Sequence, residues 1–254
     1  MKALVLAAGY ATRLYPLTKD FPKPLLTVGR QTILDYLIGN MRNLPGLDVV
    51  YVVTNSKFAP HFQSWAKALR FAAAPPPWPV EVIDDGTDSN ETRLGAVADM
   101  WYAIQTKGLD DDLLVSAGDN IYTFSLVDFY RFFAEKGSDI ILSYRISSVE
   151  KLRRTGVLQV DALNRVIGFE EKPAQPKSDL GCPALYLLQK NTLALIPAYL
   201  KQGGNPDAPG HFISWLYQQH PIYAFQMTQP YYDVGNLESY HRICQQIETS
   251  GFSY

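Results

Sequence analysis

Short apolar runs alternate with longer segments of mixed character along the first half of the chain. The runs have the length of strands, and the longer segments place apolar residues at helical spacing. The predicted strands are Lys2–Leu6, Val49–Thr54, Val80–Ile83, Leu113–Ala117 and Asp139–Arg145. The predicted helices are Thr32–Arg42, Phe58–Ala68, Thr92–Thr106 and Leu126–Lys136. Near-continuous apolar strands that alternate with helices favour a parallel sheet covered on both faces.

The pattern changes in the second half, where short strands follow one another through tight turns. These strands are Gly156–Val160, Arg165–Glu170 and Ala184–Leu188, and we expect them to join the same sheet as antiparallel additions. A last segment, Leu237–Ile247, has helical periodicity and Asn236 as its N-cap. The sequence therefore predicts one mixed α/β domain over residues 1–254, with a wound half at 1–145 and a second half at 146–254.

One proline-rich stretch, Ala72–Pro79, fits neither a helix nor a central strand, because proline lacks the backbone donor and fixes φ. It reads as a domain linker or as a surface loop. We favour the loop, because a strand pattern resumes at once at Val80.

Composition excludes several classes of protein. The 254 residues carry a net charge of −2, so the chain has no basic footprint and we expect no nucleic-acid partner. No apolar run approaches the ~20 residues of a membrane span, and the run at the N-terminus is too short for a signal peptide. Two cysteines are too few for a disulfide framework. We therefore expect a protein of the reducing cytoplasm.

The loop after the first strand carries the first candidate chemistry. In an open α/β sheet, ligands bind outside the carboxyl ends of the strands. Ala7, Ala8 and Gly9 keep this loop bare, so that backbone N–H groups can approach a ligand. Arg13 then offers a forked guanidinium group that can bind phosphate oxygens. Lys23, which lies between two prolines, offers a single positive charge. The chain lacks the P-loop, G-x-G-x-x-G, H-E-x-x-H and G-x-S-x-G motifs.

Residues 6–18 (LAAGYATRLYPLT) and 21–26 (FPKPLL) resemble the signature of the sugar-1-phosphate nucleotidyltransferases. That family includes glucose-1-phosphate thymidylyltransferases and uridylyltransferases. Three further matches follow in family order, so that the resemblance covers nearly the whole chain: Ser116–Asn120, Phe169–Pro173 and Tyr231–Gly235. The resemblance implies a Rossmann-like mixed sheet between helices, the nucleotide-diphospho-sugar transferase fold. It also implies joining of a nucleoside triphosphate to a sugar 1-phosphate, with release of pyrophosphate.

Two carboxylates complete the candidate site. Asp119 follows a predicted strand, and Asp233 follows an aromatic pair more than a hundred residues later. Two carboxylates, a triphosphate and no histidine cluster suit Mg²⁺, and the resemblance implies the same ligands. The alternative reading of Gly-Asp after a strand is a simple turn. Asp84 and Asp85 either line the nucleotide loop or cap the next segment, and the sequence favours neither.

The resemblance and the chemistry of the residues together give the expected roles. Arg13, Lys23 and Lys172 are expected to be catalytic, and Asp119 and Asp233 to hold the metal. The expected substrate-binding residues are Gly156, Glu171 and Lys172. The expected nucleotide-binding residues are Leu6, Ala7, Ala8, Gly9, Arg13, Gly95 and Asp119.

The chain departs from the family pattern at several points. Ala11 stands where glycine is common, and residues 85–96 lack the glutamines that read the base in thymidylyl and uridylyl members. Cys182-Pro183-Ala184 replaces the usual Ala/Thr-Gly. We expect no C-terminal β-helix domain, because the chain ends soon after its last helix. Members are often oligomers, so a homo-oligomer is one expectation.

Two other functions stay open at this point. One is a cytidylyltransferase that acts on a non-sugar phosphate, such as an amino-alcohol phosphate, because the segment on the sugar side is altered. The other is an inactive nucleotide-binding regulatory module. An inactive module should have lost at least one of the five charged residues, and the chain keeps Arg13, Lys23, Asp119, Lys172 and Asp233.

Overall fold

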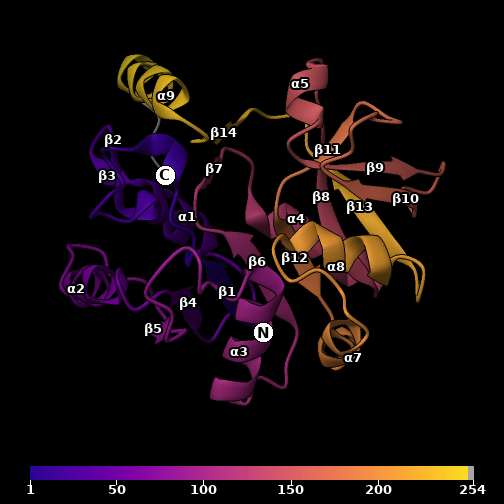
Figure 1. Ribbon diagram of the computed structural model, residues 1–254, viewed down its shortest axis with the longest axis horizontal. Helices are drawn as coiled ribbons and strands as arrows, with labels where there is room; N and C mark the ends of the chain where they lie inside the picture. Colours follow the sequence, from indigo (N-terminus) through magenta and orange to yellow (C-terminus); the bar gives the residue numbers. More distant parts are fainter. Residues whose placement is uncertain (251–254) are drawn as a thin grey trace. The chain divides into compact units, whose positions relative to one another are not determined.

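The computed structural model describes residues 1–250, and its contacts divide them into two compact units (Figure 1). Unit 1 comprises residues 1–4, 94–116 and 128–228. Unit 2 comprises residues 5–93, 117–127 and the segment that begins at Gln229. Strand β1 (Lys2–Leu6) contributes residues to both units. The units thus interleave along the chain and do not follow a division at residue 145, so the two functional halves stay a prediction.

Unit 1 is built on a mixed sheet with the strand order β1-β6-β12-β8-β11-β9-β10, and β13 adds to β8. β12 lies antiparallel to β6 and β8, and β11 and β9–β10 continue antiparallel. The expected antiparallel additions are therefore confirmed. β13 was not predicted, and it lies parallel to β8. The strands are β6 (Leu113–Ala117), β8 (Asp139–Arg145), β9 (Gly156–Val160), β10 (Val166–Glu171), β11 (Leu180–Cys182), β12 (Leu185–Leu188) and β13 (Ile222–Gln226).

The helices of unit 1 cover this sheet with aromatic side chains. Phe129 and Phe132 of α4 pack edge-on against Phe225 of β13, with ring centroids 5.7 and 5.6 Å apart. Tyr199 and Phe212 join the two helices α7 and α8 in the same way. The helices are α3 (Ala96–Lys107), α4 (Leu126–Lys136), α5 (Val149–Leu152), α6 (Lys190–Leu193), α7 (Ile196–Lys201) and α8 (Pro209–Leu216).

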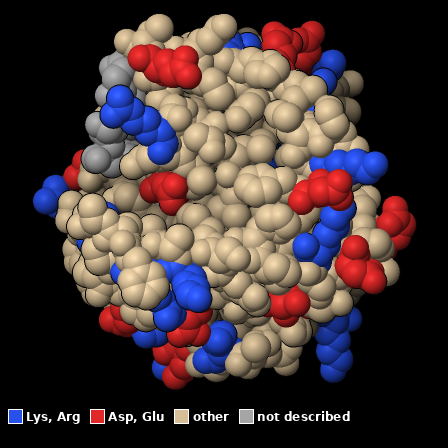
Figure 2. All heavy atoms as spheres, turned by 90° about the vertical axis from the view of Figure 1, so that its left-hand side faces the viewer, with Lys and Arg blue, Asp and Glu red and all other residues tan. Residues whose placement is uncertain are grey.

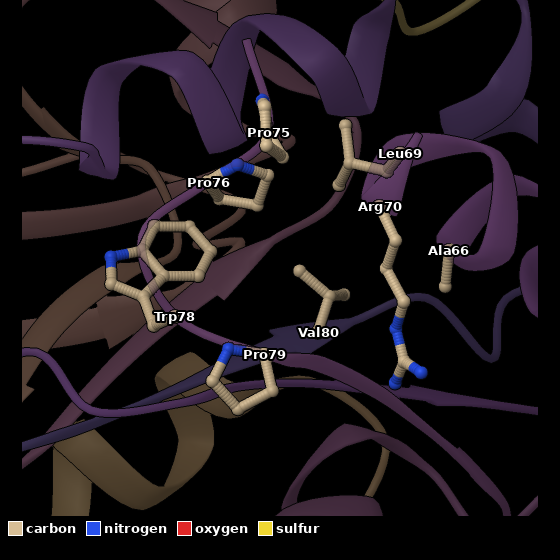
Figure 3. Close-up of a pocket in the computed structure, with 8 residues that line it drawn as sticks. All are labelled: Ala66, Leu69, Arg70, Pro75, Pro76, Trp78, Pro79 and Val80. Atoms are coloured by element: carbon tan, nitrogen blue, oxygen red, sulfur yellow. The ribbon is translucent and has the colours of Figure 1, made fainter. Parts of the chain in front are cut away.

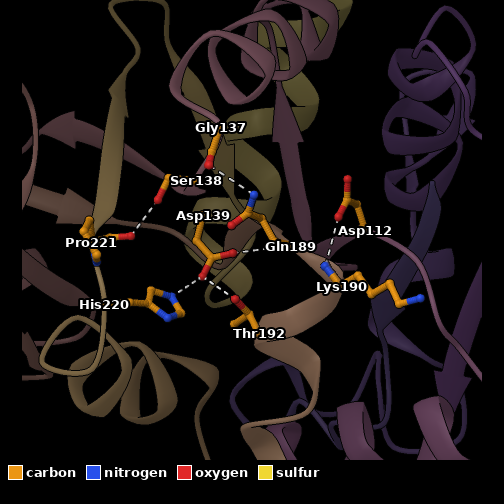
Figure 4. A network of polar contacts seen from close by, with 9 residues as sticks. All are labelled: Asp112, Gly137, Ser138, Asp139, Gln189, Lys190, Thr192, His220 and Pro221. Carbon is orange, nitrogen blue, oxygen red and sulfur yellow. Dashed lines mark hydrogen bonds and ion pairs between the residues drawn. The ribbon is translucent and has the colours of Figure 1, made fainter.

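A buried carboxylate ties several elements of unit 1 together (Figure 4). Asp139, at the start of β8, is fully buried. It accepts hydrogen bonds from the Gln189 backbone N–H at 2.6 Å and from the Thr192 hydroxyl at 2.7 Å. His220 Nε2 lies 2.5 Å from its second oxygen, Oδ2. The network fixes the end of β12 and the approach to β13 against the start of β8.

Unit 2 contains the parallel strands β4 and β5 beside β1, together with two small antiparallel pairs. In the parallel pair, Val50 lies opposite Val80 and Thr54 opposite Asp84. The strands are β2 (Thr27–Val28), β3 (Gln31–Thr32), β4 (Val50–Thr54), β5 (Val80–Asp84), β7 (Asn120–Tyr122) and β14 (Tyr231–Asp233). The helices are η1 (Thr12–Leu14), η2 (Lys23–Leu25), α1 (Ile33–Met41), α2 (Ala59–Arg70) and α9 (Leu237–Ser250).

Local sequence explains where two helices of unit 2 begin. Thr32 and Asp35 form a capping box at α1, in which each side chain accepts from the other residue's backbone N–H. Asn236 Oδ1 accepts from the Ser239 N–H at 2.8 Å, so the predicted N-cap of the last helix is confirmed. Ile243 and Ile247 of α9 pack with Leu14 and Val234 in one apolar cluster.

The proline-rich stretch is a loop within unit 2, as predicted, and it lines a pocket of about 250 Å³ (Figure 3). Arg42 holds the loop by donating to the carbonyl oxygens of Pro75, at 3.0 Å, and Ala74. The pocket is lined by Ala66, Leu69, Arg70, Pro75, Pro76, Trp78, Pro79 and Val80. Val80 begins β5, so the pocket lies at the amino end of that strand, away from the edge where ligands bind in open α/β sheets.

A protein that crosses a membrane through helices has long apolar helices, and a protein that binds a polyanion has a basic surface. Within residues 1–250, no helix has the length and apolar character that crossing a membrane requires. On the face drawn in Figure 2, the described lysine and arginine side chains are interspersed with aspartate and glutamate. That face therefore shows no continuous basic stripe of the kind that binds nucleic acid.

Candidate functional site

An ion pair between Lys23 and Asp119 lies at the centre of the candidate site in unit 2. Lys23 Nζ is 2.7 Å from Asp119 Oδ2, although the two residues are 96 positions apart. The lysine side chain is only 8% exposed, whereas that of Asp119 is 35% exposed. Pro22 and Pro24 set the backbone of η2 at this point, so the ammonium group is held in place. The structure thus brings together two of the predicted site residues.

The second predicted carboxylate is contributed by a neighbouring strand. β14 pairs antiparallel with β7, and Asp233 lies opposite Asn120, the residue after Asp119. Asp233 is exposed. Directly opposed residues of an antiparallel pair have Cβ atoms about 5 Å apart. Asp119 and Asp233 therefore lie in the same part of unit 2, as a shared ion requires.

The loop after β1 is fixed by polar side chains at the end of β4. The Thr54 hydroxyl donates to the Ala7 carbonyl at 3.2 Å, and Asn55 Nδ2 donates to the Ala8 carbonyl at 2.8 Å. Gly9, which follows, is exposed, and a Cβ built there would meet nothing within 4 Å. Next to this loop, the Gly118 N–H donates to the Leu6 carbonyl at 3.0 Å. The loop is thus a rigid, bare surface suited to backbone contacts with a ligand.

Arg13 is on the short helix η1 and is exposed, and it forms no ion pair with any residue that the structure describes. The residue that precedes this helix, Ala11, has φ 47° and ψ 43°, the left-handed conformation. The Thr18 hydroxyl donates to its carbonyl at 2.8 Å. The position where the family commonly has glycine thus has a conformation that favours glycine.

Replacing Ala11 by glycine should raise the free energy of unfolding by up to about 1 kcal/mol. Left-handed backbone costs an L-residue about 1–2 kcal/mol, part of which the greater freedom of glycine in the unfolded chain cancels. Urea denaturation measures the difference. Ala162→Gly, at an exposed position of ordinary φ, is the matched control and should lose stability. If Ala11→Gly lost as much unfolding free energy as Ala162→Gly, the left-handed conformation assigned to residue 11 would be contradicted.

The predicted sugar-phosphate residues lie together in unit 1. Glu171 ends β10 and pairs with Gly156 of β9. Its side chain is 9% exposed, and Lys172 Nζ lies 3.6 Å from its Oε1. Burial raises the pKa of the Glu171 carboxyl, and the charge and hydrogen bond of Lys172 partly oppose that shift. Lys172 is half exposed and has φ 49°, so its backbone turns sharply away from the strand.

Glu171 should make the free energy of unfolding depend on pH. Because burial raises its pKa in the folded state above the ordinary 4.5, the folded state binds this proton more tightly than the unfolded chain does. The stability that Glu171 contributes is therefore full in acid and is lost as the pH rises through the raised pKa. The unfolding free energy of the wild-type protein, minus that of Glu171→Gln, should fall between pH 4.5 and neutrality. A difference independent of pH would refute this.

Gly95 precedes α3 with φ 92°, a conformation that other residues rarely adopt. A Cβ built on it would lie 2.6 Å from the carbonyl oxygen of Pro206. The structure thus places the chain's own backbone against one side of this glycine. Contact of Gly95 with a nucleotide stays a prediction.

Several residues of these sites were missed by sequence reasoning. Thr54 and Asn55, which are fully buried, hold the loop after β1. Their signal in the sequence is a polar pair at the end of an apolar strand. No local signal in the sequence indicated Asn120, which lies opposite Asp233, or Gly210, which lies against Glu171. Each of these contacts joins segments that are distant in the sequence.

The donor set of Asp119 and Asp233 fits Mg²⁺. Among the described residues, no group of three or more His, Cys, Asp and Glu side chains is placed to hold a metal ion. Mg²⁺ commonly takes only one or two carboxylates from a protein and completes its shell with water and phosphate oxygens. Two carboxylates in one region, one exposed and one partly exposed, supply such a set.

Comparison with known proteins gives matches along the whole chain. The profile of the family described as "Nucleotidyl transferase" matches residues 2–250. A curated relative, glucose-1-phosphate adenylyltransferase from Desulfitobacterium hafniense (strain Y51), is 26% identical over 96% of this chain and 63% of the relative. The chain thus spans less than two thirds of that relative's length.

Solved structures share the fold. UDP-glucose pyrophosphorylase complexed with UDP-glucose superposes with a TM-score of 0.82 at 18% identity, covering 98% of each chain. A Bacillus anthracis protein in complex with sucrose, assigned as a glucose-1-phosphate thymidylyltransferase, gives a TM-score of 0.78 at 20% identity. That match covers 100% of this chain and 98% of the other. The predicted Rossmann-like mixed α/β fold is confirmed.

Proposed function

The chain belongs to the nucleotidyl transferase family, and we propose that it joins a nucleoside triphosphate to a sugar 1-phosphate, releasing pyrophosphate and forming an NDP-sugar. One observation carries the proposal: the buried Lys23 pairs with Asp119, and Asp233 lies opposite the next residue. This cluster follows β6 and stands beside the bare loop after β1. It offers both a cation and acids to a triphosphate.

The reaction needs charge placement more than proton transfer. A phosphate oxygen of the sugar 1-phosphate attacks the α-phosphorus, a new P–O bond forms, and the bond to pyrophosphate breaks. The nucleophile is already an anion near neutral pH, so no general base is required. Because two anions must be brought together, catalysis depends mainly on positioning and electrostatic stabilisation. The matched motifs contain no histidine and no serine triad, which agrees with this chemistry.

The proposed roles in unit 2 follow from exposure and contacts. Arg13, exposed on η1, would hold the β- and γ-phosphates that leave. Lys23 is held by Asp119 at 2.7 Å, so its charge is oriented before a substrate binds. Mg²⁺, when bound by Asp119 and Asp233, would supply positive charge that offsets phosphate repulsion. Leu6, Ala7, Ala8 and Gly9 would present backbone groups to the nucleotide.

The proposed roles in unit 1 concern the sugar 1-phosphate. Lys172 is half exposed at the end of β10 and would bind the phosphate group. Glu171 would accept hydrogen bonds from sugar hydroxyls, because its carboxylate is an acceptor held beside Gly156. The names of the similar proteins, a glucose-1-phosphate adenylyltransferase and a UDP-glucose pyrophosphorylase, support a sugar phosphate over an amino-alcohol phosphate.

We also infer that the protein works in a reducing cytoplasm. Cys182 and Cys244 are both free thiols. Burial raises the pKa of the Cys182 thiol, so this cysteine is an inert packing residue.

The proposal is tested with a panel of nucleoside triphosphates and phosphates in the presence of Mg²⁺, with pyrophosphate release as the readout. We expect release with at least one sugar 1-phosphate, and the panel then also identifies the base. Release only with CTP and an amino-alcohol phosphate would replace the sugar by the alternative substrate. Silence for every pair would favour an inactive nucleotide-binding module.

A further inference from the structure

The carboxylate of Glu171 lies in a space that two glycines leave open. An ideal Cβ built on Gly210 would lie 1.9 Å from Glu171 Oε2, and one built on Gly156 would lie 3.1 Å from the same oxygen. Real Cβ atoms essentially never approach within 3.0 Å of another heavy atom. The observed position of the carboxylate therefore requires glycine at position 210.

Gly210 is the second residue of α8, and this helix is fixed to the strand that carries Glu171. The Ser214 hydroxyl donates to the Phe169 carbonyl of β10 at 2.9 Å. The amino end of a helix carries partial positive charge, which stabilises a nearby carboxylate. The side chain of Glu171 thus lies against the amino end of α8.

The segment that leads into α8 is also held in place. The Val97 N–H donates to the Pro206 carbonyl at 2.9 Å, and the Ala96 N–H donates to the Asp207 carbonyl at 3.1 Å. These donors belong to the first turn of α3, whose N–H groups have no partner within their own helix. Gly95 permits this contact, because a Cβ there would lie 2.6 Å from the Pro206 carbonyl oxygen. The start of α8 is therefore anchored on both sides of Gly210.

We propose that Gly210 is a positioning residue of the sugar-phosphate site, which fixes the Glu171 carboxylate by having no side chain. This inference rests on the proposed function for the identity of the substrate. The recognised groups are the hydroxyls of a sugar phosphate, which donate to a carboxylate held at one place. Because the start of α8 is anchored, the Glu171 carboxylate keeps the same position whether or not a ligand is bound.

Gly210→Ala tests the proposal. To bring the contact from 1.9 Å to 3.0 Å, the carboxylate must move by about 1.1 Å. Because it is the far end of a flexible side chain, the fold should tolerate the change. A shift of this size should raise the KM for the sugar phosphate by about 10-fold or more, with the KM for the nucleotide changed by less than about two-fold. Gly168→Ala on the same strand is the matched control, because the atom nearest to its Cβ would be Gln159 Oε1, the end of a flexible side chain, at 2.7 Å.

A double-mutant cycle separates positioning from a general structural effect. Aspartate at 171 is one methylene shorter and leaves room for the new methyl group, so Gly210→Ala should not raise the KM further in a Glu171→Asp background. Equal increases of KM in both backgrounds would overturn the proposal. If Gly210→Ala alone does not fold, folding of the double variant supports the contact, and failure of both variants to fold overturns it.

A crystal structure of Gly210→Ala gives a readout that does not depend on activity. A displaced Glu171 carboxylate supports positioning even if the wild-type protein turns over no pair of the panel, in which case the proposed function alone has failed. A carboxylate that stays in its wild-type place overturns the inference, whatever the enzyme does.

Discussion

Asp119→Ala lowers turnover by about 10²-fold or more, the size of effect that follows loss of a single oriented electrostatic group in other enzymes. The substitution removes an acid that fixes Lys23 at 2.7 Å and that would hold the metal with Asp233. It also leaves a buried ammonium group without its partner, so the free energy of unfolding should fall as well. Pyrophosphate release at saturating substrates measures the effect on turnover, and urea denaturation measures the effect on stability.

Two further variants are compared with Asp119→Ala. Asp128→Ala removes an exposed aspartate that pairs with Arg131 on the surface of α4, and it should leave turnover unchanged. Arg13→Ala should lower turnover about as much as Asp119→Ala. Its unfolding free energy should be unchanged, because Arg13 is exposed and forms no ion pair with the described residues. Turnover of Asp119→Ala within a few-fold of the wild-type protein would refute its assignment.

The largest effect on stability alone is expected for Asp139→Ala, with a loss of about 3 kcal/mol or more of unfolding free energy. Asp139 is fully buried and accepts from the Gln189 backbone and the Thr192 hydroxyl at 2.6 and 2.7 Å. Its removal leaves the buried Thr192 hydroxyl and the partly buried Gln189 N–H without their acceptor, and it removes the partner of His220. Each unsatisfied buried donor costs about 1–3 kcal/mol.

Urea denaturation measures this loss, and a nearby hydroxyl provides the control. Ser138→Ala removes an exposed hydroxyl that donates to the Pro221 carbonyl at 2.7 Å in the same network (Figure 4). Its effect should stay within about 0.5 kcal/mol. Turnover per folded molecule should be normal in both variants. An Asp139→Ala protein as stable as the control would show that the network does not hold these strands.

The alternation of apolar strands and amphipathic helices was sufficient to predict the longer strands and helices in the first half of the fold. The strands Lys2–Leu6, Leu113–Ala117 and Asp139–Arg145 and the helix Leu126–Lys136 have the predicted bounds. The helix predicted to begin at Thr92 begins instead at Ala96. Its first N–H groups are used by the Pro206 and Asp207 carbonyls, a partner more than a hundred residues away. Local propensity cannot contain that information.

The elements that the sequence analysis missed are short or depend on distant partners. β13 has only five residues and follows a turn, and its parallel place beside β8 comes from tertiary pairing. β7 and β14 have three residues each and exist because they pair with each other. The sequence around His220 shows no partner for this residue, yet it contacts the buried Asp139.

The candidate site was more accessible to sequence reasoning than these small strands. Proline-flanked Lys23 and the Gly-Asp after a strand were predicted to converge, and the structure places them in an ion pair. The sequence showed that Ala11 stands where the family commonly has glycine, and the structure gives the reason, because Ala11 has the left-handed conformation. The contact of Gly210 with Glu171 was not foreseen, because a glycine shows no chemistry until its neighbour in space is known.

The interleaving of the two units bears on how the protein is made. The segment that carries β14 begins at Gln229, whereas its partner β7 and the residue Lys23 are synthesised far earlier. During translation, Lys23 and Asp119 can meet while Asp233 is still absent. A nascent or prematurely terminated chain therefore has the cation and one acid but not the second. The acidic pair is thus complete only once synthesis has passed Asp233.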